Sequence, residues 1–172
     1  MTTQAPTTAT DTGSVVRSYF EALGRQDRDA QLSWYAPDGR GRFYGLQDEP
    51  NTREEVREFF TELFDAFPDF KLEIRDLLVE GDRAAVHWGA TGTFTGGRFL
   101  GLLPTGQRLD LEGVDLVQVR DGKIARIDAF TDSSEMARQL GAMPPRDSVA
   151  DKATLGAVNL VTRAKQLIQS RR

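Results

Sequence analysis

The fold is decided by the stretch from Asp82 to Asp132, which reads DRAAVHWGATGTFTGGRFLGLLPTGQRLDLEGVDLVQVRDGKIARIDAFTD. Three runs in it are typical of β-strands, because they are rich in β-branched residues or alternate between apolar and polar side chains: 83–94, 108–119 and 123–130. The dipeptide Asp121-Gly122 separates the last two runs. It favours a type I′ turn, in which both central residues have positive φ, so we predict a hairpin here.

A longer link, residues 95–107, joins the first two runs, and its glycines and proline predict a loop. The centre of this loop, Phe99 to Leu103, is apolar. An apolar surface loop has to cover something, which is either the edge of the core or a ligand cavity.

The residues before this stretch predict mainly helices. Apolar residues recur at helical spacing in residues 14–23, with Ser14 as the expected N-cap, and again in residues 27–35. Pro37-Asp38-Gly39 is expected to end the second helix. Residues 42–45 predict a short strand.

The clearest helix begins at Thr52. Thr52 and Glu55 form a capping box, and an apolar stripe then continues to Phe67. Pro68 is expected to end this helix, and residues 70–79 alternate like a half-buried strand.

Helices therefore come first and about four strands follow, an order that predicts an α+β fold. The simplest way to bury the apolar stripes is a curled antiparallel sheet with the helices packed across its concave face. A cone of this kind, partly open at its mouth, provides a pocket. A short helix at residues 133–140, capped by Ser133, is expected to end the domain at Gly141.

Residues 142–172 form a C-terminal extension for which we predict one amphipathic helix, with Ser148 and Asp151 at its start. The face of this helix contains Leu155, Val158, Val161, Lys165 and Ile168, with Leu160, Ala164 and Leu167 beside them. Three interpretations are open. The helix packs on its own domain or on a twin subunit, it forms a lid over the cavity mouth, or it lies on a membrane surface.

Composition restricts the class of protein. The 172 residues suit one domain, and a net charge of -4 gives no basic field for nucleic acid. No apolar run approaches the roughly 20 residues that span a bilayer, so we expect no membrane partner. Residues 1–13 are expected to be disordered and lack the basic and apolar parts of a secretion signal, which predicts a cytoplasmic location.

The chain has no cysteine and one histidine. Disulfides, thiolate catalysis and sites with several histidine ligands are therefore excluded. A magnesium site made of carboxylates alone is conceivable but has no support, so we expect no metal and no cofactor.

One carboxylate is a candidate catalytic group. In residues 108–119 the odd positions are apolar except for Asp115, so this side chain is expected on the buried face. Burial without a charged partner raises a carboxyl pKa toward neutrality and makes the group a useful proton carrier. The alternative is a structural Asp bonded to a neighbouring strand or turn.

The single histidine, His87, has small or apolar neighbours on both sides. It is either a core or edge residue, or a member of the site. If it points inward, it could pair with Asp115 as a proton relay.

Aromatic side chains are candidates for the wall of an apolar chamber suited to a flat hydrophobic ligand. The proposed lining residues are Trp34, Tyr44, Trp88, Phe94, Phe99 and Phe130. Plain core packing is the alternative for each. Core packing is less expected for Phe94, Phe99 and Phe130, because these residues lie in a loop or at strand ends.

The strings GTFTGGRFLGLLPTG and EGVDLVQVRDGKIARIDAFTD resemble the SnoaL-like polyketide cyclases, a family of the nuclear-transport-factor-2-like superfamily. The resemblance covers residues 14–141. It implies a cystatin-like α+β barrel, polar cavity residues at Asp115 and His87, and a homodimer formed through the convex face of the sheet.

The last strand departs from the family pattern. The catalytic His-x-Asp of the family corresponds to Ile127 and Ala129, and Phe94 stands where the family often has His. The neighbouring Asp128 is expected to face the other way unless a bulge turns it inward.

Three functions follow as hypotheses. The first is a cofactor-independent cyclase or isomerase of a hydrophobic, polyketide-like carbonyl compound, in which Asp115 removes a proton next to the carbonyl with help from His87. The second is a non-catalytic binding protein for a small molecule, motivated by the missing His-x-Asp. The third is a hydroxylase of the same family that works without a metal.

Overall fold

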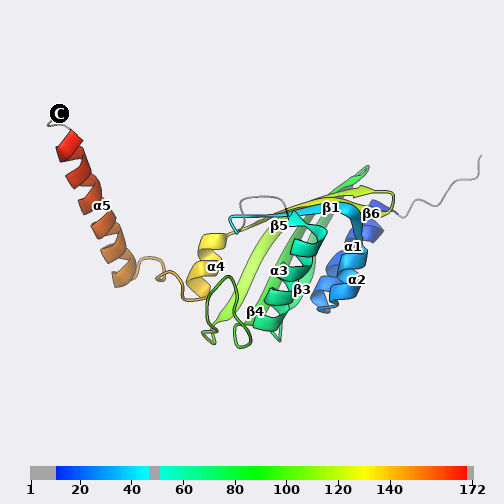
Figure 1. Cartoon of the computed structure of the whole chain (residues 1–172), viewed down its shortest axis with the longest axis horizontal. Coiled ribbons are helices and arrows are strands. Elements are labelled where there is room, and N and C mark those ends of the chain that lie inside the picture. Colours follow the sequence, from blue (N-terminus) through cyan, green and yellow to red (C-terminus); the bar gives the residue numbers. More distant parts are fainter. Residues whose placement is uncertain (1–10, 47–50, 170–172) are drawn as a thin grey trace, which may run out of the picture.

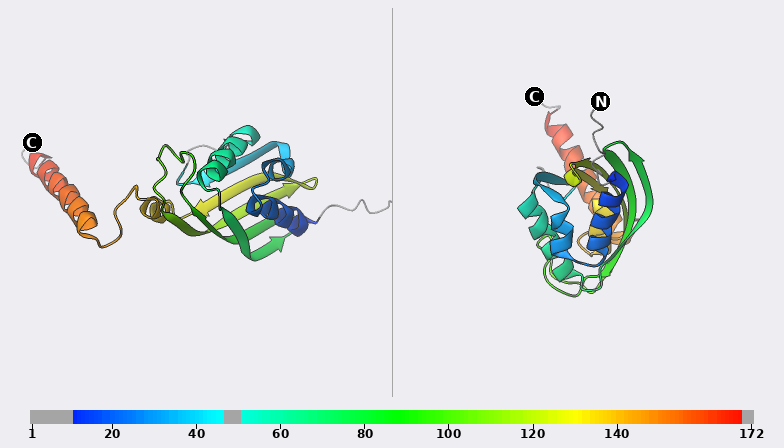
Figure 2. Two further views of the ribbon diagram at one scale, coloured as in Figure 1. Left: turned by 90° about the horizontal axis from the view of Figure 1, so that it is seen from below. Right: turned by 90° about the vertical axis from the view of Figure 1, so that its right-hand side faces the viewer.

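The computed structural model describes residues 11–46 and 51–169. It confirms the predicted α+β fold, in which a curled sheet encloses helices on its concave side and a further helix follows at the C-terminus (Figure 1, Figure 2). The helices are α1 (Thr12–Gly24), α2 (Arg28–Ser33), α3 (Arg53–Ala66), α4 (Ser133–Gln139) and α5 (Val149–Gln169). The strands are β1 (Tyr35–Tyr44), β2 (Asn51–Thr52), β3 (Lys71–Glu80), β4 (Arg83–Thr93), β5 (Arg108–Arg120) and β6 (Lys123–Thr131).

The strand order in this sheet is β2-β1-β6-β5-β4-β3. The strands β3 to β6 follow one another as antiparallel neighbours, whereas β1 is parallel to β6. The predicted antiparallel sheet is therefore confirmed for β3 to β6, and the pair of β1 and β6 is the exception. Residues 45–122 separate β1 from β6, so no tight turn forces them to run in opposite directions.

The first strand is longer than the short strand predicted from residues 42–45. It includes Pro37, which was expected to end a helix. The register between β1 and β6 shifts between Tyr35 and Arg40, so Pro37 lies where the ladder is interrupted. Its missing N–H consequently removes no regular ladder bond, which is why a proline is tolerated there.

Two helix starts differ from the prediction. The first residue of α1 is Thr12, after Asp11, so the predicted cap at Ser14 is wrong. The cap of α4 is Asp132, whose carboxylate accepts a hydrogen bond from the Glu135 N–H, and not Ser133. The segment predicted to be disordered thus contains the first turn of α1, while its residues 1–10 lie outside the described residues.

Other local predictions are confirmed. Thr52 and Glu55 form the capping box of α3. Asp121 and Gly122 have φ of 52° and 70°, as a type I′ turn between β5 and β6 requires. The side chain of Phe99, in the apolar loop, is buried.

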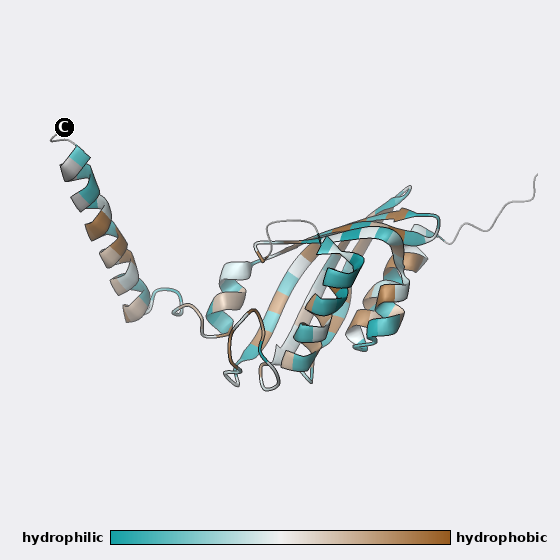
Figure 3. Ribbon diagram, in the orientation of Figure 1, coloured by the Kyte–Doolittle hydropathy of each residue, from teal (hydrophilic) through white to brown (hydrophobic). Residues whose placement is uncertain are grey.

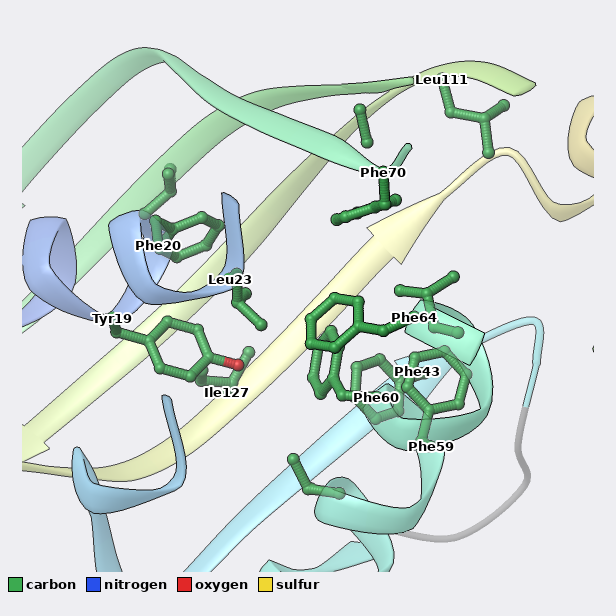
Figure 4. Close-up of a cluster of buried hydrophobic side chains, with 14 of the residues drawn as sticks. Tyr19, Phe20, Leu23, Phe43, Phe59, Phe60, Phe64, Phe70, Leu111 and Ile127 are labelled. Atoms are coloured by element: carbon green, nitrogen blue, oxygen red, sulfur yellow. The ribbon is translucent and has the colours of Figure 1, made fainter. Parts of the chain in front are cut away.

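The core fills the concave side of the sheet. α1 and α3 turn their apolar stripes toward the strands and their polar faces outward (Figure 3). Side chains from both helices meet those of β1, β5 and β6 in one cluster, which includes Phe20, Phe43, Phe60 and Leu111 (Figure 4). The convex face of the sheet is therefore left toward solvent, and its concave face is turned to the interior. The candidate site lies on the concave face.

The C-terminal helix does not pack on its own domain. α5 stands away from the barrel (Figure 1), and all of its side chains that the structure describes are exposed except Asp151. The interpretations of a helix packed on its own barrel, or closed over its own cavity, are therefore wrong for this conformation. None of the described helices is long and apolar enough to cross a membrane.

Candidate functional site

A cavity of about 90 Å³ lies between the sheet and helices α1 and α3. Its wall is made almost entirely of aliphatic and aromatic side chains, several of which appear in Figure 4. They include Phe20, Leu23, Phe43, Phe59, Phe60, Leu63, Phe70, Leu72, Trp88, Phe99, Leu109, Leu111 and Met136. Asp115 is the one ionisable carboxylate in this lining.

The alternation of β5 places Asp115 in the cavity. Every second residue of this strand is buried, and Asp115 is only 7% exposed. Its neighbours in the sheet are Val86 on β4 and Ala129 on β6, neither of which offers a polar side chain. The predicted inward placement of Asp115 is therefore correct.

Trp88 binds the carboxylate. The indole Nε1–H donates a hydrogen bond to Asp115 Oδ1 over 2.7 Å, and among the described residues it is the one donor to this side chain. Gly113 leaves room for the indole, because a Cβ at this position would lie 2.3 Å from Trp88 Cζ2. The sequence suggested Trp88 as a wall residue, but nothing in it indicated the hydrogen bond.

The environment of Asp115 changes its acidity. Burial raises the pKa of this carboxyl to about 7, and the hydrogen bond from Trp88 opposes the rise without cancelling it. Near neutral pH, substantial fractions of the group are therefore protonated and ionised. Such a group can both accept and donate a proton, which is what an acid/base catalyst requires.

His87 does not join the site. It pairs with Val114, a residue on the outer face of β5, and its Nε2 lies 3.6 Å from the Glu112 carboxylate there. Successive side chains of a strand point to opposite faces, so the inward position of Trp88 turns His87 outward. The proposed relay between His87 and Asp115 is wrong for this geometric reason.

The predicted aromatic wall is correct in part. Trp88 and Phe99 line the cavity; Tyr44 also borders it, but its ring stacks on Phe130 on the outer side of the sheet. Phe94 is fully buried in the core against Phe67, with ring centroids 5.2 Å apart.

The other two predicted wall residues lie outside the cavity. The ring of Trp34 faces the Lys123 ammonium at 5.5 Å. Phe130 is 41% exposed and stacks on Tyr44 on the outer side of the sheet. Ala129 takes the inward position instead, because Phe130 is the next residue along β6.

The positions of the family's usual catalytic pair are apolar here. Ile127 is buried in the core, and Ala129 lines the cavity. Ala129 is the direct cross-strand partner of Asp115. Side chains opposite each other in an antiparallel pair lie about 5 Å apart at Cβ, so Asp115 and Ala129 lie in the same layer of the barrel. Asp128 faces outward and pairs with the Arg126 guanidinium.

A buried polar cluster lies outside the cavity lining and was missed from the sequence. The Tyr19 and Tyr35 hydroxyls are 3.5 Å apart, and Gln31 Nε2 donates to Tyr19 Oη over 3.3 Å. Burial raises the pKa of both tyrosines, so they remain neutral. Tyr19 sits in the helical stripe of α1, where periodicity alone gave no sign of a polar contact.

The architecture and the acidic cavity together define the class of protein: a barrel of the nuclear-transport-factor-2-like superfamily, with a carboxylate held in an apolar chamber. The family model of the SnoaL-like polyketide cyclases matches residues 13–140, about three quarters of the chain, so the chain belongs to this family.

Solved structures agree with this assignment. AclR from Streptomyces galilaeus, described as "a putative hydroxylase", has a TM-score of 0.72 at 22% identity and covers 92% of this chain and 98% of its own. A "putative SnoaL-like polyketide cyclase" from Jannaschia sp. CCS1 has a TM-score of 0.70 at 28% identity, over 83% of this chain and 100% of its own. IdmH from Streptomyces antibioticus, "a putative polyketide cyclase", has a TM-score of 0.66 at 26% identity, over 76% and 99%. No curated protein sequence matches the chain.

Proposed function

We propose that this protein is a cofactor-independent cyclase or isomerase that acts on a hydrophobic, polyketide-like carbonyl compound. The observation that carries the proposal is the Asp115 carboxyl, with a pKa raised to about 7, in a cavity whose wall is otherwise almost entirely apolar. Membership in the SnoaL-like polyketide cyclase family supports the substrate class.

The reaction uses Asp115 first as a base and then as an acid. Its ionised carboxylate removes a proton from the carbon next to a ketone, which leaves an enolate. The enolate carbon then bonds to a second carbonyl carbon of the same substrate and closes a ring. The protonated carboxyl returns its proton to the resulting alkoxide, so the enzyme ends in its starting state.

Trp88 has a positioning role in this scheme. Its hydrogen bond engages Oδ1 and leaves the other oxygen of Asp115 for the substrate proton. Because the bond favours the ionised form, it also keeps the pKa from rising further above neutrality.

The size of the cavity adds a requirement. Its volume of about 90 Å³ is below the roughly 300–1,000 Å³ typical of sites for drug-sized ligands. A substrate of two or more rings therefore needs displacement of side chains at the wall. Phe99 lies on a loop rather than on a helix or strand and is the wall residue we expect to move.

Proton abstraction can be tested without knowing the natural substrate. We expect the protein to exchange the α-protons of 2-tetralone, a two-ring apolar ketone, for deuterium in D2O, as followed by proton NMR. Asp115→Asn should reduce the exchange rate by at least about 100-fold, the scale of general-base catalysis. Asp110→Asn is the matched control, because Asp110 is an exposed carboxylate on the same strand. Equal exchange by the wild type and the Asp115 variant would refute the assignment.

A non-catalytic binding protein is the second candidate, because Ile127 and Ala129 replace the family's usual catalytic pair. It predicts saturable binding of apolar ketones with no exchange above the buffer rate. The hydroxylase alternative takes support from the name of AclR, a relative in fold, and predicts consumption of O2 that depends on substrate. A cytoplasmic location stays a prediction.

A further inference from the structure

The C-terminal helix exposes apolar side chains that no part of its own barrel covers. Leu155 and Val158 of α5 are each 57% exposed, and Leu160 and Val161 are exposed as well. Between Leu155 and Val161 the only polar residue is Asn159. A helix segment that is apolar on nearly all sides is typical of a buried helix rather than a solvated one.

The helix also needs packing to be stable. α5 has 21 residues and contains Gly156 and several β-branched residues, which lower helix propensity. In proteins most helical stability comes from packing of an apolar face rather than from propensity, so we expect tertiary or quaternary contacts to stabilise α5.

A complementary surface lies on the outer face of the sheet. A groove of about 550 Å³ crosses β3, β4, β5 and β6 near their ends opposite α4. Leu78, Ala85 and Leu116 form one cross-strand row in its floor, and the two leucines are 67% and 50% exposed. Charged side chains flank this row, including Glu80, Arg83 and the Arg126–Asp128 pair.

In this structure α5 of the same chain lies away from this groove, and its described apolar side chains are exposed. Arg146 contacts the carboxylates of Asp132 and Glu135 at 3.5 and 3.8 Å, which holds the linker against α4 and leaves two residues before α5 begins. Leu116 lies six positions along β5 from Asp110, which is hydrogen-bonded to Gln139 of α4, a separation of about 20 Å.

We propose that the protein is a homodimer in which α5 of each copy packs into the outer-sheet groove of the other copy. The arrangement is reciprocal, so it forms two identical contacts and closes on itself. A helix of 21 residues is about 32 Å long, and half of its surface is roughly 500 Å². Two helices and two groove surfaces then bury about 2,000 Å², at the upper end of the roughly 1,200–2,000 Å² of stable interfaces.

The structural similarity to AclR indicates that a segment after the barrel also occurs in another protein of this fold. Residues 1–141 make up about four fifths of the chain, so a match over 92% includes part of the segment after Gly141. At 22% identity this comparison concerns the fold alone.

The first test measures mass against concentration by light scattering on the full chain. We expect the wild type to be a dimer and the double variant Leu155→Asp/Val158→Asp to be a monomer. The dimer dissociation constant of the double variant should be at least about 100-fold higher than that of the wild type. Leu116→Asp, in the groove, should have the same effect. Ala153→Asp on α5, on the side of the helix away from Leu155 and Val158, and Asp76→Asn on β3 are exposed control substitutions and should leave the dimer intact.

Mixing the two monomeric variants gives the decisive result. A heterodimer of the α5 variant and the groove variant contains one intact helix and one intact groove that face each other, so mixing should restore dimers. An interface between two sheets would lose dimers only in the groove variant, and an interface between two α5 helices only in the α5 variant. The proposal is overturned if only one of the two variants loses the dimer. It is also overturned if the mixture stays monomeric or if the wild type is a monomer at about 100 μM.

The absence of cysteine allows a direct check of the same contact. We expect chains carrying Val158→Cys and chains carrying Leu116→Cys to form a disulfide-linked pair when mixed and oxidised, in greater yield than either variant forms alone. Preferential linkage of Val158→Cys chains to one another would contradict the groove contact.

Discussion

Removal of the charge on Asp115 should make the protein more stable at alkaline pH. The folded pKa of this carboxyl, about 7, is above its ordinary value of 3.8, so the native state binds the proton more tightly than the unfolded state does. The contribution of this proton to stability is complete below about pH 4 and is lost as pH rises to about 7. The shift is about three pKa units at 1.36 kcal/mol each, which gives a loss of roughly 4 kcal/mol.

Asp115→Asn keeps an oxygen that can accept the Trp88 hydrogen bond and removes the ionisation. We therefore expect the variant to be close to the wild type in stability at pH 4.5 and more stable by roughly 2–4 kcal/mol at pH 8. The assay is urea unfolding at both pH values, followed by far-UV circular dichroism. Backbone spectra are preferable to tryptophan fluorescence, because Trp88 itself contacts the substituted side chain.

Asp69→Asn provides a control of opposite sign. The Asp69 carboxylate accepts hydrogen bonds from the N–H and the hydroxyl of Thr93, which lower its pKa. That stabilisation is present above the unfolded pKa and is lost in acid, so Asp69→Asn should destabilise the protein at pH 8 and have less effect at low pH. A stability difference between Asp115→Asn and the wild type that is the same at both pH values would refute the reasoning about burial.

Three further predictions concern the cavity. Trp88→Phe removes the hydrogen bond to the carboxylate, so the pKa of Asp115, measured by 13C NMR of its carboxyl, should rise above the wild-type value, and a lower value would contradict the assigned contact. Phe99→Ala should cost about 3–5 kcal/mol in urea unfolding and increase the binding of 1-anilinonaphthalene-8-sulfonate, because a buried ring leaves the cavity wall. A cost below about 1 kcal/mol would show that the loop does not close the chamber. His87→Ala should change stability by less than about 1 kcal/mol and leave tetralone exchange within about twofold, since among the described residues its one ionic contact, with Glu112, is on the outer face. A larger loss of tetralone exchange in the His87→Ala variant would show that His87 takes part in the reaction after all.

Local rules predicted several features that depend on adjacent residues, although the predicted caps at Ser14 and Ser133 are wrong. The capping box at Thr52 and the turn at Asp121-Gly122 depend on a few adjacent residues, and both are as expected. The conformation of β1 depends instead on a distant partner. Pro37 is excluded from regular ladders, and only the register shift against β6 makes its position in a strand acceptable.

The same distinction applies to the site. Period-2 alternation was sufficient to place Asp115 inward. Applied to β4, it also gives the correct answer for His87, since Val86, Trp88 and Ala90 form the apolar face and His87 lies between them. The hydrogen bond between Trp88 and Asp115 joins two strands, and it required the register of β4 against β5, which the sequence alone does not supply.

The empty position at Gly113 constrains how this site could have arisen or could be transferred to a related barrel. Any larger residue there would meet the indole ring and the Phe130 carbonyl oxygen, which a Cβ would approach to 2.7 Å. An acid introduced in the manner of Asp115, without the glycine two residues earlier, would lack its tryptophan donor. Positions 88, 113 and 115 therefore have to be exchanged as a set, and an evolutionary route that acquires the glycine first avoids an intermediate with a steric clash.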